Sequence, residues 1–154
     1  MATVFDAAAY ILDKLGSTSA MKLQKLVYYS QAWSLVWDGE PLFDSRIEAW
    51  IDGPVVRELY ECHRGQFKVD RATVTKGDAT RLTADQIETI DAVLETYGDK
   101  SPQWLSDLTH RENPWKVARS GLKPSERGNS EISHASMAEY YGALYGQSQG
   151  EAAR

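Results

Sequence analysis

One stretch of the chain decides its fold: MKLQKLVYYSQAWSLVW, residues 21–37. At helical spacing, one face of this stretch carries Leu23, Leu26, Val27, Ser30, Trp33, Ser34 and Trp37, and the other carries Tyr28, Ala32, Leu35 and Val36. A helix that is apolar nearly all round packs against neighbours on more than one side. The pattern therefore predicts a central helix from Ser19 or Ala20 to about Trp37, with Leu23, Leu26, Trp33 and Trp37 buried.

Signals for further helices flank this segment on both sides. Thr3 is placed to cap a helix from Val4 to Leu15, which Gly16 would end. Four more helices are predicted by a Thr83/Gln86 capping box with Gly98 as terminator, by Ser101-Pro102, by Asn113-Pro114, and by Ser133 ahead of the stripe Met137, Tyr140, Tyr141, Leu144 and Tyr145.

Strand signals are short and few. Residues 46–52 alternate, with Ile47, Ala49 and Ile51 on one side of a predicted strand. Asp52-Gly53 would then form a turn, Pro54 would open a helix, and Gly65 would close it. A small hairpin is expected from Ala72–Thr75 and Thr80–Thr83, around Lys76-Gly77-Asp78.

These elements together predict a mainly α protein. We expect a compact multi-helix single domain around a central buried helix, with a small β-hairpin or short strands. The domain would span residues 1–146, with a mobile loop at 120–130, which is rich in Gly, Ser and charge, and a flexible C-terminal tail at 147–154.

Composition narrows the possible partners. A chain of 154 residues suits one domain, and a net charge of -5 with a pI of about 5.2 argues against a general phosphate-binding surface. The single cysteine, Cys62, has no partner for an internal disulfide, which fits a reducing cytosol. We expect no signal peptide, and we find no apolar run of the ~18–20 residues that a membrane span requires. We expect a cytoplasmic protein with no direct membrane or nucleic-acid partner.

Candidate catalytic and metal-binding residues are sparse. Cys62 and His63 are adjacent, so on a helix their side chains diverge by about 100°. No CxxC or HExxH spacing supplies further metal ligands, so neither a metal nor a cofactor is expected. A Cys62 nucleophile paired with His110 or His134 stays open, because folds assemble such pairs from distant positions. A half-buried Cys62 beside a solvent-facing His63 is the simpler interpretation, and no enzyme is predicted.

Tryptophan and tyrosine are abundant, with five and eight residues. Trp33, Trp37, Trp104 and Tyr97 fall on apolar stripes and are expected in the core. For Trp50 and Trp115, both core packing and contact with a partner protein remain open, since Trp, Tyr and Arg are the usual anchors of protein interfaces.

Several segments, in this order, resemble the Panacea, or SocA-like, antitoxin domain over about residues 5–145. They are residues 22–33 (KLQKLVYYSQAW), 39–43 (GEPLF), 47–50 (IEAW), 52–56 (DGPVV), 108–110 (LTH), 114–116 (PWK) and 132–133 (IS) before Tyr140-Tyr141.

The resemblance implies a helical antitoxin of bacteria, phages or prophages that binds and neutralises a toxin encoded by the adjacent gene. One branch of the family instead delivers its toxin to a ClpXP-type protease. The family has no established catalytic centre. The candidate partner-binding residues are Trp50, Asp52, Arg57, His63, Trp115 and Lys116.

Overall fold

The structure, a computed structural model, describes residues 2–152. Its helices are α1 (Val4–Leu15), α2 (Ala20–Trp37), α3 (Arg57–His63), η1 (a 3-10 helix, Ala79–Arg81), α4 (Ala84–Tyr97), α5 (Pro102–Arg111), α6 (Asn113–Ala118) and α7 (His134–Ala152). Its strands are β1 (Thr18–Ser19), β2 (Ile47–Trp50), β3 (Gly53–Val56) and β4 (Lys68–Val69). The fold is mainly α, as predicted.

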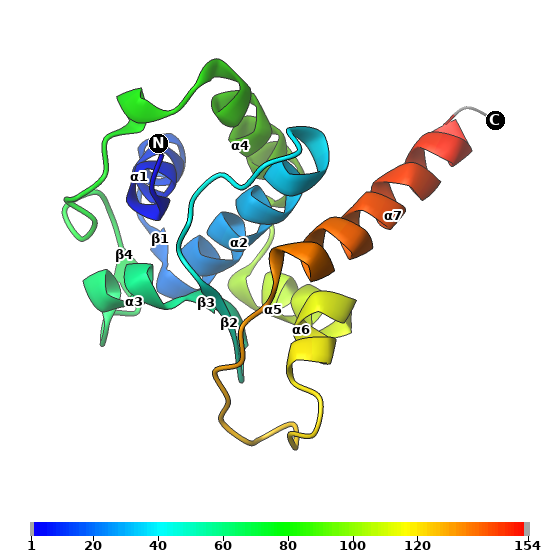
Figure 1. Cartoon of the computed structure of the whole chain (residues 1–154). Coiled ribbons are helices and arrows are strands. Elements are labelled where there is room, and N and C mark those ends of the chain that lie inside the picture. The colour runs from blue at the N-terminus through cyan, green and yellow to red at the C-terminus, as the bar shows by residue number, and fades with distance from the viewer. Residues whose placement is uncertain (1, 153–154) are drawn as a thin grey trace.

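Helix α2 is the centre of the molecule. It packs against α1, α4, α5 and α7, and it is buried continuously from Leu23 to Ser34 (Figure 1). Ser19 caps its first turn, where Oγ accepts a hydrogen bond from the Lys22 amide. The predicted central helix and its limits are therefore confirmed.

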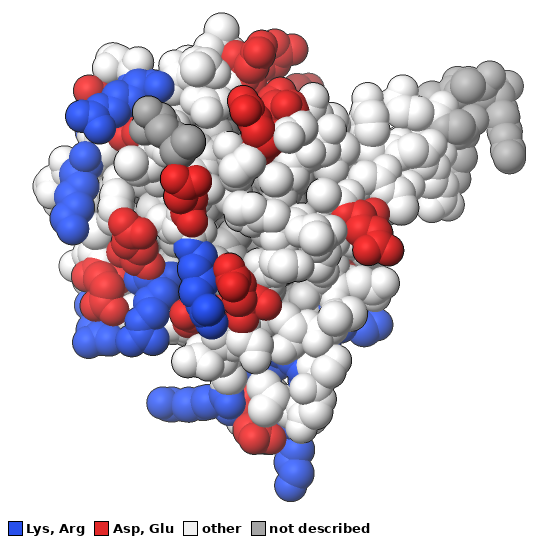
Figure 2. All heavy atoms as spheres, viewed as in Figure 1, with Lys and Arg blue, Asp and Glu red and all other residues white. Residues whose placement is uncertain are grey.

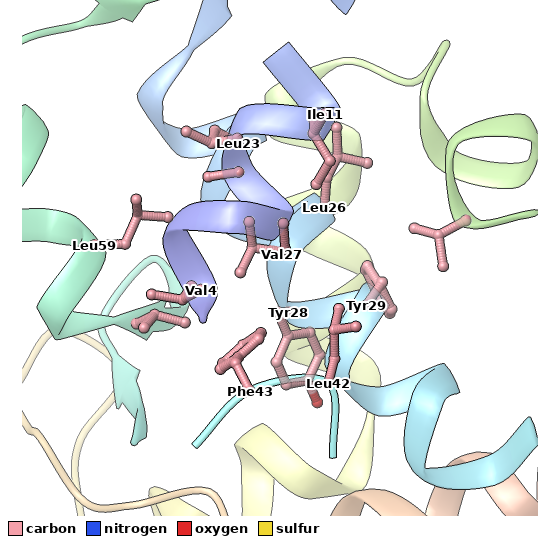
Figure 3. Close-up of a cluster of buried hydrophobic side chains, with 14 of the residues drawn as sticks. Val4, Ile11, Leu23, Leu26, Val27, Tyr28, Tyr29, Leu42, Phe43 and Leu59 are labelled. Carbon is pink, nitrogen blue, oxygen red and sulfur yellow. The ribbon is translucent and has the colours of Figure 1, made fainter. Parts of the chain in front are cut away.

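The core around α2 draws side chains from distant parts of the chain. Val4 and Ile11 of α1 and Leu59 of α3 gather near the α2 residues Leu23 and Val27 (Figure 3). Leu42 and Phe43, in the segment between α2 and β2, close the cluster beside Tyr28 and Tyr29 (Figure 3).

Buried polar groups tie the backbone to this core. Gln31, fully buried on α2, accepts hydrogen bonds from the amides of Leu42 and Phe43 at 2.7 and 3.2 Å. Its own amide nitrogen donates to the Phe43 carbonyl at 2.8 Å. These three bonds satisfy the side chain and hold the segment before β2 against α2.

A cluster around Glu112 joins α2, α4 and α7 to the junction between α5 and α6. The hydroxyls of Tyr29 and Tyr141 both donate to the same carboxylate oxygen of Glu112, each at 2.7 Å. Tyr29 also stacks on Tyr97 with ring centroids 4.2 Å apart. Burial raises the pKa of Glu112, and the two tyrosine hydrogen bonds oppose that effect. One carboxylate thus connects α2 and α7 to the junction between α5 and α6.

Helix caps appear where the sequence predicts them. Thr3 and Asp6 form a capping box at α1, and Thr83 and Gln86 form one at α4. Ser101 caps α5, and the Ser133 hydroxyl accepts a hydrogen bond from the Ser136 amide in the first turn of α7. These four helix starts are confirmed.

The segment at Pro54 differs from the prediction. Residues 53–56 form strand β3, which pairs antiparallel with β2 so that Ala49 faces Pro54, and α3 begins only at Arg57. The cause lies on α2, where Gln24 bonds both the amide and the carbonyl of Val56, at 2.9 and 3.3 Å. The prediction of a helix start at Pro54 was therefore wrong.

Two other local predictions were wrong. The hairpin expected at 72–83 is replaced by turns and η1, because the Asp78 amide donates to the Asp6 carboxylate of α1 at 2.9 Å. The two-residue strand β4 pairs instead with β1. Trp37 and Trp104, expected in the core, are 40% and 42% exposed. Each lies near the end of its helix, where no neighbouring element covers the whole ring.

Helix α7 leaves the body of the protein. Met137 and Tyr141 are buried at its base, whereas its later turns project away from the other helices (Figure 1). Residues 147–152 continue this helix, and 153–154 lie outside the described residues. Flexibility of the 147–154 tail stays a prediction. Nowhere in residues 2–152 is a helix both long and apolar enough to cross a membrane.

Candidate functional site

Two of the six candidate residues, Trp50 and Arg57, line a surface hollow beside the β2–β3 hairpin. The residues that line this hollow are Trp50, Ile51, Arg57, Tyr60, Arg127, Gly128 and Asn129. We call the surface formed by Trp50, Arg57, Tyr60 and Arg127 the hairpin face. It combines side chains from β2, from α3 and from the loop that follows α6.

Trp50 is held in place on two sides. Its ring meets that of Tyr60 edge-on, with centroids 4.8 Å apart. Its indole N–H donates to the Glu48 carboxylate at 2.8 Å, and the other oxygen of that carboxylate accepts from Arg46 at 3.1 Å. The indole is only partly buried, so a defined ring surface remains open to solvent.

Trp115 supports the hairpin by a hydrogen bond from its side chain to the hairpin backbone. The Trp115 indole N–H donates to the Trp50 carbonyl at 2.7 Å, and its ring stacks on His110 with centroids 4.1 Å apart. The guanidinium of Arg119 lies over the Trp115 ring, 5.1 Å from its centroid. Trp115 therefore contributes to the site mainly by positioning β2.

Arg119 fixes the loop that carries Arg127. Although charged, Arg119 is only 6% exposed. Its guanidinium donates to the Ala49 carbonyl at 3.2 Å, to the Lys123 carbonyl at 3.3 Å and to the Glu126 carbonyl. The loop after α6 is thereby tied to strand β2.

Lys25 lies buried beneath the hairpin. It is 1% exposed and donates to the Pro54 carbonyl at 3.2 Å. Burial lowers the pKa of Lys25 from 10.5 to about 8, and the negative charge of Asp52 opposes this effect. Gly53 is packed against this lysine: an added Cβ would lie 2.4 Å from Lys25 Cε.

His63 is buried, so the predicted solvent-facing position was wrong. Gln24 accepts from the Val56 amide through its oxygen, so its NH2 group faces the His63 Nε2, 2.9 Å away. Nε2 must then accept, which places the proton of a neutral His63 on Nδ1. Burial lowers the pKa of His63, and the charge of Lys25 acts in the same direction. His63 packs against Tyr60 from behind the hairpin face.

The other candidate catalytic groups, Cys62, His110 and His134, have different neighbours. Burial lowers the pKa of His110, whose Nε2 is buried without a hydrogen-bond partner, and His134 Nε2 lies 3.3 Å from Gln31. Within the described part of the chain, no hydrogen bond joins the Cys62 thiol to His110 or His134. That part also contains no group of three or more His, Cys, Asp or Glu side chains placed to hold a metal ion.

The remaining candidates, Asp52 and Lys116, do not line the hollow. Asp52 is exposed at the hairpin turn, where its carbonyl accepts from Ser106 at 2.6 Å. Lys116 is exposed on α6. Sequence reasoning missed Tyr60 and Arg127. Tyr60 follows Arg57 by three positions on α3, a spacing that places both on one helix face. Arg127 offered no such signal, because its place depends on Arg119.

The charges of the molecule are unevenly distributed. The Asp and Glu side chains at the top of the view stand apart from any Lys or Arg, whereas at the left and lower edges Lys and Arg side chains are mixed with further Asp and Glu side chains (Figure 2). The hairpin face has two arginines and no carboxylate among the residues that line its hollow. Partly exposed Trp and Tyr side chains beside exposed Arg side chains, as on the hairpin face, are features of a protein-binding surface.

Comparison with known proteins identifies the kind of module. The family described as "Antitoxin SocA-like, Panacea domain" matches residues 23–116. Antitoxin SocA of Caulobacter vibrioides (strain NA1000 / CB15N) is 32% identical over 130 residues, which cover 74% of this chain and 69% of that protein. No solved structure gives a significant match. The chain belongs to the SocA-like, Panacea-domain antitoxin family.

Proposed function

We propose that this protein is an antitoxin that neutralises a cognate toxin, encoded by the adjacent gene, by binding it directly in the cytoplasm. Membership in the antitoxin family supports this function. The observation that carries the proposal is the convergence of Trp50, Tyr60, Arg57 and Arg127 on one surface hollow. In this proposal the protein acts without catalysis.

The hairpin face would supply the central contacts with the toxin. Trp50 and Tyr60 offer apolar ring surface, and partly buried aromatic side chains contribute most where an interface excludes water. Arg57 and Arg127 can donate paired hydrogen bonds to carboxylates or backbone carbonyls of the toxin. Asp52 and Lys116 would lie at the edge of this contact, where charges influence the encounter more than the final affinity. The bound antitoxin would then cover the active site or substrate-binding face of the toxin.

Co-expression with the product of the adjacent gene tests this function. We expect growth rescue and a complex that co-purifies. Replacing Arg57 by Glu, or Trp50 by Ala, should weaken the complex by at least about tenfold, as expected for an interface anchor. Arg81→Glu is the matched control, because Arg81 is exposed on η1 and lines no part of the hollow.

Two results would contradict the proposal. The antitoxin function fails if wild-type protein neither rescues growth nor co-purifies with the toxin. The assignment of the interface fails if the Arg57 and Trp50 variants bind as tightly as the Arg81 control. Toxin half-life is measured in the same strains: a half-life shortened by the antitoxin would replace sequestration with delivery to a ClpXP-type protease.

A further inference from the structure

A second exposed aromatic surface lies where α2 ends. Trp37 and Tyr145 are 40% and 39% exposed, and together we call them the aromatic patch. Trp37 stacks on Trp33 with centroids 4.9 Å apart, and Tyr145 meets Trp37 edge-on at 6.3 Å. The stacking fixes the Trp37 ring while leaving part of it open.

Carboxylates surround this patch. Two adjoining hollows share Trp37, Asp38 and Asp85; Glu88 lines one of them and Glu40 the other. No Lys or Arg lines either hollow. In the described part of the chain, none of these four carboxylates takes part in an ion pair.

The negative charge of this surface favours a positively charged partner. A second copy of the chain, docked patch to patch, would bring the same carboxylates against each other, which is unfavourable. A cationic side chain with an apolar stem matches both properties, since its stem can cover the aromatic rings while its charge faces the carboxylates. The chain itself contains such contacts: the Lys100 ammonium lies 5.2 Å from the Trp104 ring centroid, and Arg119 lies over Trp115.

We propose that the aromatic patch binds an arginine- or lysine-bearing segment of the partner protein, with a cationic side chain over the Trp37 ring and against the carboxylates of Asp85 and Glu88. As an account of toxin recognition, this inference rests on the proposed antitoxin function. It assigns a second contact, separate from the hairpin face and of opposite charge. The two surfaces together would require a toxin that presents a basic segment at one place and carboxylate or carbonyl acceptors at another.

The test uses the full chain and two synthetic peptides, one of alternating arginine and glycine and the other of alternating glutamate and glycine. Indole N–H signals are followed by NMR, and Trp37→Phe identifies the Trp37 signal. We expect the arginine peptide to shift that signal and salt to reverse the shift, because exposed charges are screened. The shift should fall severalfold in the double variant Asp85→Asn, Glu88→Gln. The matched control is Asp99→Asn, at an exposed carboxylate that lines neither hollow.

Equal shifts with both peptides, or an unchanged response in the double variant, would overturn the inference. Toxin binding then separates it from the proposed function. If wild-type protein binds the toxin and the double variant binds equally well, the patch assignment is wrong while the antitoxin function stands. If wild-type protein binds no toxin, the antitoxin function fails, and the peptide titration still decides whether the patch selects cations.

Discussion

Trp115 donates its indole N–H to the carbonyl oxygen of Trp50 at 2.7 Å, across 65 positions of sequence. The bond joins α6 to the end of strand β2. It holds the backbone of Trp50, the residue whose ring is part of the hairpin face. Trp115 therefore acts on the site by fixing the backbone from which the Trp50 side chain projects.

Trp115→Phe should destabilise the protein by about 1–2 kcal/mol, because the partly buried Trp50 carbonyl loses this donor while an aromatic ring remains to stack on His110. Denaturant unfolding measures the effect. Trp104→Phe is the control, since Trp104 is 42% exposed and should change stability by less than about 0.5 kcal/mol. Equal effects at the two positions would contradict the role of the hydrogen bond.

Gly53→Ala should cost at least about 2 kcal/mol of folding free energy. Gly53 has φ of +126°, and an added Cβ would lie 2.4 Å from Lys25 Cε and 3.0 Å from Thr109 Oγ1. Gly142→Ala, in helix α7 with no atom within 4 Å of the added Cβ, should instead stabilise by about 0.5–1 kcal/mol. Thermal unfolding of both variants checks the difference in sign.

Lys25 should make stability depend on alkaline pH. Its pKa is about 8 in the folded protein and 10.5 in the unfolded chain, so between these values the unfolded chain binds more protons. The free energy of unfolding should therefore rise from pH 8 towards 10, relative to Lys25→Met, by up to about 3 kcal/mol at 1.36 kcal/mol per pKa unit. Urea unfolding of both proteins at several pH values measures this, and parallel pH profiles would contradict it.

Glu112→Ala should destabilise by about 2–4 kcal/mol, because the buried hydroxyls of Tyr29 and Tyr141 both lose their acceptor. Glu112→Gln keeps an acceptor oxygen and should cost less. The pKa of Glu112 is raised in the folded state, so the folded protein binds a proton more readily than the unfolded chain. Wild-type stability should then increase relative to Glu112→Gln as pH falls from neutral towards 4.5. Unfolding of the three proteins at two pH values checks both expectations.

Much of the helical fold could be predicted from the sequence because caps are local. Thr3, Thr83 and Ser101 each satisfy amides within three residues of their own position. Pro54 could not be predicted correctly from its neighbours in sequence. The Gly53-Pro54 pair is typical of a helix start, but Gln24 and Lys25 of α2 form hydrogen bonds with the backbone of residues 54–56 and keep them in a strand. Trp37 fits an apolar stripe, yet burial also requires a neighbour that reaches the end of the helix.

The candidate site was predicted in part. The grouping of Trp50, Asp52 and Arg57 follows from their closeness in sequence, and Trp115 joins them through one long-range hydrogen bond. His63 looked like a surface residue because its burial depends on Gln24, far away in the sequence. Arg127 could not be predicted, since a loop residue acquires a position only through tertiary contacts such as those of Arg119.

The Arg119 bonds have a consequence for the kinetics and heat capacity of the proposed toxin binding. Because they hold the loop before a partner arrives, Arg127 requires no disorder-to-order transition on association. The heat-capacity change should then match the apolar area covered at the interface, without the larger contribution of coupled folding. Association should proceed in a single step whose rate responds to ionic strength, and dissociation should account for most of the affinity difference among variants.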